Sequence, residues 1–140
     1  MITMSPSPQE IKTVVDSLSI VDNSIILCKR ISEPTLFQIQ YSIELTKEMA
    51  REHNIQMYIL DARGTIAPNA ELRQGLRTHV ATFADVLDYL YIAVGDDPTL
   101  KISSAFIFHT MPQNFTVQLV STPEEGIALL KEIQQQKKNF

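Results

Sequence analysis

One short apolar run in the sequence ends abruptly in groups that could do chemistry. Residues 57–60 are all apolar, and Asp61, Arg63 and Gly64 follow at once. Such a run is typical of a strand that is buried on both faces of a sheet. Ligands and partners usually dock at the carboxyl edge of open α/β sheets. The loop from Asp61 to Asn69 is therefore the first place where we expect function.

Several catalytic chemistries lack the residues that they need. The four glycines form neither a dinucleotide-binding nor a P-loop pattern. No G-x-S-x-G elbow supplies a nucleophile. His53, His79 and His109 have no second ligand at metal-binding spacing, so each is expected to be an ordinary surface or boundary residue. We therefore expect no metal, no cofactor and no enzymatic activity.

Asp96 and Asp97 follow a second apolar run and have two interpretations. They could contribute to a divalent-ion site, or Asp97 could cap a helix whose first residue is Pro98. No third acid is visible nearby, so capping is favoured. Cys28 is the only cysteine. A single cysteine excludes an internal disulfide, and Cys28 is expected to be a small core residue.

The composition is that of one ordinary domain. The chain has 140 residues, 44% apolar and 20% charged, with a formal net charge of −4. The negative charge argues against nucleic-acid binding. No apolar run approaches the roughly 20 residues of a membrane-spanning helix. Residues 1–10 do not resemble a secretory signal, so a cytoplasmic location is expected.

The elements that position the Asp61 loop are expected to alternate. Residues 1–10 are predicted to be a flexible arm, and residues 11–140 to be one α/β domain. Two β-rich runs, 11–20 and 24–30, flank the turn residues Asp22 and Asn23, which indicates an antiparallel hairpin. Helices are predicted over about 35–54, 69–85, 99–110 and 123–133, and further strands over 57–60, 89–94 and 115–120. The order β-β-α-β-α-β-α-β-α implies a central, mixed and mostly parallel sheet flanked by four helices.

The first predicted helix is more apolar than a simple surface helix. One stripe suits packing on the sheet, and a second ridge recurs every four residues well round from it. The ridge either packs within the domain or faces a partner, a second copy or an apolar ligand. It consists of Phe37, Tyr41, Leu45 and Met49.

The second predicted helix presents basic residues away from its apolar face. Arg73 and Arg77 must point to solvent or to a partner. Together with the strand-end loop they form the predicted partner-binding set, which is Asp61, Arg63, Thr65, Asn69, Arg73 and Arg77.

From about Val14 to Ile133 the pattern resembles the STAS or SpoIIAA-like family of anti-sigma-factor antagonists and related STAS/SEC14-type domains. The residues that carry the resemblance are the strand Tyr58 to Asp61 with Gly64, the strand Tyr91 to Val94 followed by a helix, and the final strand and helix from Val117 to Leu130. The resemblance implies a SpoIIAA-like fold and a regulatory, protein-binding role.

The sequence departs from the antagonists at their phosphorylation site. Those proteins carry Asp-Ser eight and nine residues after the strand-end aspartate, and here Asn69 and Ala70 stand in those places. No phosphorylation switch is therefore expected there. The leading hypothesis is a non-enzymatic interaction module that binds a protein regulator. The alternative is a carrier or sensor of an apolar small molecule or lipid, held between the sheet and its helices.

Overall fold

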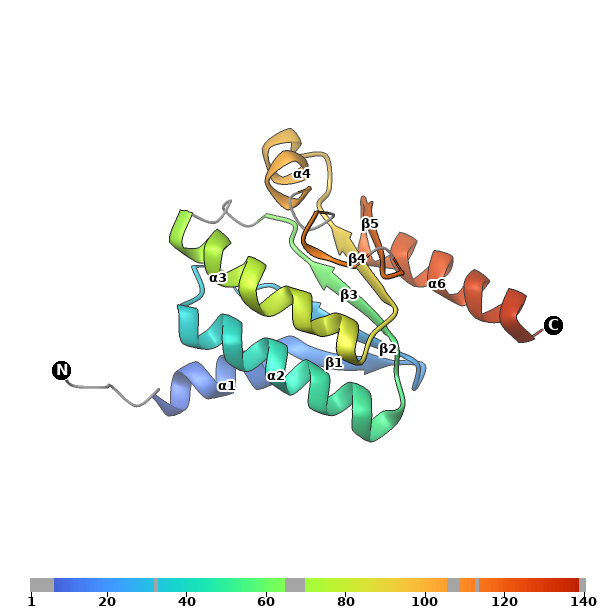
Figure 1. Ribbon diagram of the computed structural model, residues 1–140, viewed down its shortest axis with the longest axis horizontal. Helices are drawn as coiled ribbons and strands as arrows, with labels where there is room; N and C mark the ends of the chain where they lie inside the picture. The colour runs from blue at the N-terminus through green and yellow to red at the C-terminus, as the bar shows by residue number, and fades with distance from the viewer. Residues whose placement is uncertain (1–6, 32, 65–69, 106–108, 113, 139–140) are drawn as a thin grey trace.

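The protein is an α/β domain built on a five-stranded mixed sheet (Figure 1). The computed structural model describes residues 7–31, 33–64, 70–105, 109–112 and 114–138. The strands are β1 (Leu18–Val21), β2 (Ile25–Lys29), β3 (Met57–Asp61), β4 (Tyr89–Ala93) and β5 (Thr116–Val120). The helices are α1 (Pro8–Ser17), α2 (Leu36–His53), α3 (Ala70–Val80), the 3₁₀ helix η1 (Ala81–Asp85), α4 (Pro98–Ser104) and α6 (Pro123–Lys138).

The strands lie side by side in chain order, from β1 to β5. β1 and β2 form the predicted antiparallel hairpin, and Asp22 and Asn23 adopt the positive φ angles of its turn. The remaining neighbours are parallel. Residues 57–60 therefore lie in the middle strand, as predicted.

Helices cover both faces of the sheet. On one face, strand residues such as Tyr58 and Ile92 share a core with residues of α2, α3 and η1. On the other face, Ile59 and Tyr91 pack with Leu130 of α6. The alternation of strand side chains thus divides the core into two layers, which confirms that β3 is buried on both sides.

Helix ends follow the predicted capping chemistry. Thr35 caps α2, and Asn54 ends it in the left-handed conformation. The Asp97 side chain accepts hydrogen bonds from the backbone N–H groups of Thr99 and Leu100, with Pro98 at the first helical position. The capping interpretation of Asp97 is therefore confirmed.

The prediction for the amino-terminal region is wrong in part. Residues 11–17 belong to helix α1 and not to a strand, so the described residues include a helix that is not among the four predicted. The helix begins at Pro8, within the expected arm; residues 1–6 lie outside the described residues. Ser7 and Glu10 form a reciprocal capping box, which nucleates the helix despite its β-branched residues.

Two further boundaries differ from the prediction. The second predicted helix is divided into α3 and the tighter η1. The third ends, within the described residues, at Ser104, and residues 106–108 of its predicted range lie outside them.

Candidate functional site

Asp61 ends β3, and Arg63 follows it at the carboxyl end of the strand; the Asp61 side chain is 15% exposed and that of Arg63 is 42% exposed. The Arg63 guanidinium donates from Nε to Oδ1 of Asp61 at 2.9 Å and from Nη2 to Oδ2 at 3.1 Å. The backbone N–H of Arg63 also donates to Oδ1 at 3.2 Å. Asp61 thus holds the start of the following loop. Ala62, between them, is buried on the opposite side.

These bonds set the ionisation of Asp61. Partial burial alone would raise the pKa of this carboxyl, but hydrogen bonds from Arg63 and the charges of Arg63 and Lys29 outweigh it, so the pKa lies below its ordinary value. Next to this pair, Gly64 has a φ of +72° with open space around it, a conformation that suits glycine.

The other predicted partner-binding residues are only partly described. Arg73 and Arg77 lie on α3 with exposed side chains. Thr65 and Asn69 lie outside the described residues. Ala70 is exposed and is the first residue of α3. The carboxyl edge therefore carries exposed arginines from both β3 and α3.

The apolar ridge of α2 is half-buried along its whole length. The rings of Phe37 and Tyr41 stack on each other with centroids 5.5 Å apart. Met49 packs against the core of the α2 face of the sheet. The Met49 end of the ridge is therefore packed within the domain.

A cavity of about 100 Å³ lies between the sheet and the α2–α3 layer. Its floor consists of side chains from three adjacent parallel strands. Cys28, Leu60 and Ile92 are direct neighbours across these strands, and Tyr58 and Leu90 form the next row. Every floor residue comes from the same side of its strand.

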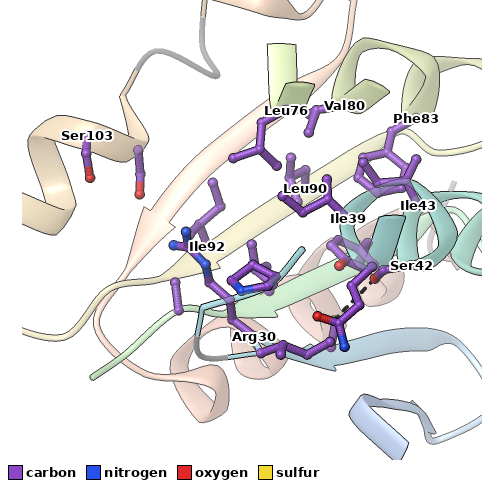
Figure 2. Close-up of a pocket in the computed structure, with 18 residues that line it drawn as sticks. Arg30, Ile39, Ser42, Ile43, Leu76, Val80, Phe83, Leu90, Ile92 and Ser103 are labelled. Atoms are coloured by element: carbon purple, nitrogen blue, oxygen red, sulfur yellow. Dashed lines mark hydrogen bonds between the residues drawn. The ribbon is translucent and has the colours of Figure 1, made fainter. Parts of the chain in front are cut away.

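The roof of the cavity comes from the three helices α2, α3 and η1 (Figure 2). Ile39 and Ile43 project from α2, while Leu76 and Val80 project from α3 and Phe83 from η1. Ser103 of α4 lies on the other side of the cavity in the same view. The remaining lining residues are Arg30, Ile31, Pro34, Gln38, Ser42, Ala62 and Ser104. The cavity is therefore largely apolar.

Arg30 follows β2 at the carboxyl edge of the sheet. Its backbone N–H donates to the Asp61 carbonyl at 2.9 Å, which extends the β2–β3 ladder by one residue. Being two positions after Cys28, it faces the same side of the sheet and lines the cavity. Burial lowers the pKa of the guanidinium from its ordinary value. An arginine remains charged in proteins nonetheless.

A small polar cluster lies beneath α1 and α2. The Cys28 sulfur is 3.8 Å from Oγ of Ser17 and 4.0 Å from Oγ of Ser42. Burial raises the pKa of the Cys28 thiol, and hydrogen bonds with Tyr58, Ser17 and Ser42 offset this in part. Burial likewise raises the pKa of Tyr58 well above its usual range. At 4% exposure, Cys28 is the core residue that the sequence predicts.

The described part of the chain contains neither a metal-binding cluster nor a membrane-spanning helix. No three His, Cys, Asp or Glu side chains gather closely enough there to hold an ion. None of the helices in those ranges has the length and apolarity needed to cross a bilayer.

Comparison of the chain with family models, with curated proteins and with solved structures gives no match.

Sequence reasoning placed its alternative ligand site between the sheet and the helices, but it did not identify the residues that line the cavity, and it missed Arg30. The available signal was the position of Arg30 directly after a buried strand, at the same sheet edge as Asp61. The described lining residues come from seven helices and strands and from the segments after β2 and β3, and no local sequence pattern reports such a set.

Proposed function

We propose that the protein binds a small apolar molecule in the cavity between the sheet and the α2–α3 layer. The observation that carries the proposal is the cavity itself, which is lined mainly by aliphatic and aromatic side chains. Concave, mostly apolar sites with a few polar groups are the usual form of small-molecule sites. This reverses the order of the two hypotheses that the sequence supports.

The size of the cavity limits the ligand. Apolar cavities of about 150 Å³ bind benzene. The present cavity, of about 100 Å³, suits an apolar body of about four to six carbon atoms. A longer, lipid-like ligand would require α2 and α3 to move apart.

The test combines NMR titration with cavity filling. We expect 1-hexanol and benzene to shift the backbone amide signals of cavity-lining residues in the wild type. Val80→Phe places a ring in the cavity and is expected to abolish these shifts, with Val80→Ile as a milder variant should Val80→Phe unfold. Val15→Phe is the matched control, since Val15 is exposed on α1 and far from the lining set.

Two further outcomes bear on this proposal. The first is native mass spectrometry of freshly purified protein. A bound small mass in the wild type, and none in the Val80 variant, would support the proposal. Unshifted amide signals for all probes up to their solubility limit would refute it.

A second candidate is the regulatory interaction module that the STAS and SpoIIAA-like resemblance suggests. It is favoured by Ile102, which lies on α4 with 76% of its side chain exposed, close in sequence to the carboxyl end of β4. The exposed arginines Arg63 and Arg73 would add charge to such a surface. The element order β-β-α-β-α-β-α-β-α from β1 onward supports the SpoIIAA-like fold assignment.

The interaction module has its own test. The measurement is a pull-down of a regulator protein with the wild type and three variants. Retention by the wild type and by Val15→Asp, with loss in Ile102→Asp and in Arg73→Asp, would support the interaction module. Equal retention by all variants would refute this surface. Because Ala70 occupies the place of the phosphorylated serine, intact-mass analysis after incubation with lysate and ATP should show no phosphate on the 65–73 peptide. The cytoplasmic location remains a prediction from the sequence.

A further inference from the structure

One group gives the cavity a chemical polarity. Among the described residues that line it, Arg30 alone carries a formal charge, and the others are apolar or neutral. In Figure 2 the guanidinium nitrogens of Arg30 lie on the side of the cavity toward Ser103, and the aliphatic side chains of Leu76 and Ile39 lie beyond them. The cavity therefore has one charged end, and the rest of its lining is largely apolar.

Two of the neutral polar side chains near Arg30 in the lining, those of Gln38 and Ser103, are already engaged. The Gln38 amide accepts a hydrogen bond from the Thr35 backbone N–H at 3.0 Å and donates to the Glu10 carbonyl at 3.4 Å. The Ser103 hydroxyl donates to the Leu100 carbonyl at 3.2 Å. Recognition of a ligand's polar end therefore falls mainly to Arg30. A guanidinium has five N–H donors, enough to bind a carboxylate in addition to partners within the protein.

We propose that the ligand is a monocarboxylate with an apolar body of about four to six carbons, bound with its carboxylate on Arg30 and its body among the aliphatic side chains of the cavity. This assignment rests on the proposed function and names the ligand class.

The charge balance favours one carboxylate over other ligands. A single buried guanidinium neutralises a monoanion, and the two planar groups can pair through parallel N–H to oxygen bonds. A phosphate monoester carries up to two charges near neutral pH, so one arginine would leave a charge uncompensated in an apolar site. An amine would place two positive charges side by side. Pro34 and Gln38, at the start of α2, also line the cavity. The positive end of the α2 helix dipole therefore adds to the attraction for an anion.

The experiment compares three six-carbon probes, hexanoate, 1-hexanol and hexylamine, by NMR titration of the intact protein. We expect hexanoate to bind with a dissociation constant on the order of 1 mM or tighter. It should bind at least tenfold tighter than 1-hexanol, and hexylamine should bind more weakly than both. Arg30→Gln should weaken hexanoate binding at least tenfold and change 1-hexanol binding less than threefold.

Lys29→Gln is the matched control. Lys29 is the preceding residue, carries the same charge, is exposed, and points to the other side of β2. It should leave hexanoate affinity within about twofold, since an exposed charge at this distance is screened by solvent. Should Arg30→Gln unfold, Arg30→Lys keeps the charge, loses the planar fork, and should still weaken hexanoate binding more than Lys29→Gln does.

The outcomes separate the two proposals. Equal affinity for hexanoate and 1-hexanol, or equal effects of Arg30→Gln and Lys29→Gln on hexanoate, would overturn carboxylate recognition and leave the apolar site standing. Failure of every probe to perturb the cavity would overturn the proposed function, and the ligand class with it.

Discussion

The guanidinium of Arg63 binds both carboxylate oxygens of Asp61, two residues earlier in the chain, at 2.9 and 3.1 Å. A paired arginine and carboxylate of this geometry fixes the direction of the chain as it leaves the central strand. The pair therefore fixes the backbone at the carboxyl end of β3. It also orients Ala62, the intervening residue, toward the cavity that it lines.

The pair predicts how stability depends on pH. The pKa of Asp61 is lowered in the folded state, so its contribution is present above the unfolded value of about 3.9 and is lost as the pH falls through the folded value. Asp61→Asn should lower the melting temperature at pH 7, and its difference from wild type should shrink below about pH 4. Asp96→Asn, at an exposed acid, is the control. A difference that stays constant from pH 7 to acid would contradict this assignment.

Helix α1 offers a matched pair of adjacent valines. Val14 is fully buried at 0% exposure, while Val15 is 48% exposed. Val14→Ala should destabilise the protein by about 1 to 3 kcal/mol through lost burial and a residual cavity. Val15→Ala should stay within about 0.5 kcal/mol of wild type. Urea unfolding with unchanged m-values measures both, and equal effects would show that α1 is not docked as described.

The cap of α4 provides a second matched pair. Asp97 accepts two backbone hydrogen bonds, whereas its neighbour Asp96 is exposed in the preceding turn. Asp97→Ala should cost about 1 kcal/mol and speed amide hydrogen exchange in the first turn of α4, and Asp97→Ser should restore most of the loss. Asp96→Ala should change neither quantity. Because α4 supplies Ser103 and Ser104 to the cavity wall, Asp97→Ala should also weaken probe binding.

Cys28 should react slowly with alkylating reagents in the native protein. Its side chain is 4% exposed, and burial raises the pKa of the thiol, so little reactive thiolate is present at neutral pH. The rate should rise only at a pH above the range in which an ordinary thiol ionises, and denatured protein should react at once. Since Cys28 is the only cysteine and lines the cavity, alkylation followed by intact mass reports on this site alone. Rapid native labelling at pH 7 would contradict the burial.

Self-association through the α2 ridge stays a prediction, but less of the ridge is exposed than a fully free helix face would offer. Burying an apolar side chain contributes about 1.5 to 3 kcal/mol, but the ridge is already half-covered and association costs about 4 to 15 kcal/mol. We expect weak dimers at most, centred on Phe37 and Tyr41. Phe37→Ser with Tyr41→Ser should reduce any association seen by sedimentation and leave the fold intact. Tight dimers that survive this change would exclude the ridge as the contact.

Features that depend on neighbouring residues were predictable from the sequence. The central strand, the hairpin turn and the caps at Thr35 and Asp97 all rest on local rules. Helix α1 was missed although Ser7 and Glu10 carry its capping box, because Val14 and Val15 have β-branched side chains that favour strands.

Features that depend on packing between distant elements were not predictable. Lys47 of α2 is buried although its side chain is charged. Gln40 of α2 bonds to His79 of α3 at 3.0 Å, so part of the polar side of this helix packs against another helix, while Glu44 stays exposed. The cavity has the same origin, since Cys28, Leu60 and Ile92 become neighbours only through the register of three strands.

The agreement between strand order and chain order has a consequence for how the protein assembles. Each strand pairs with the strand that precedes it in the chain, so every pairing closes a loop of moderate length and no strand waits for a distant partner. During synthesis, the emerging β3 can add to a β1–β2 hairpin that already exists, and β4 and β5 can follow in turn. At each stage the strand that was added last forms the edge of the sheet, and the next strand of the chain pairs with that edge. Exposure of unpaired edges to other chains should therefore be brief, which favours high yields of correctly folded protein without assistance.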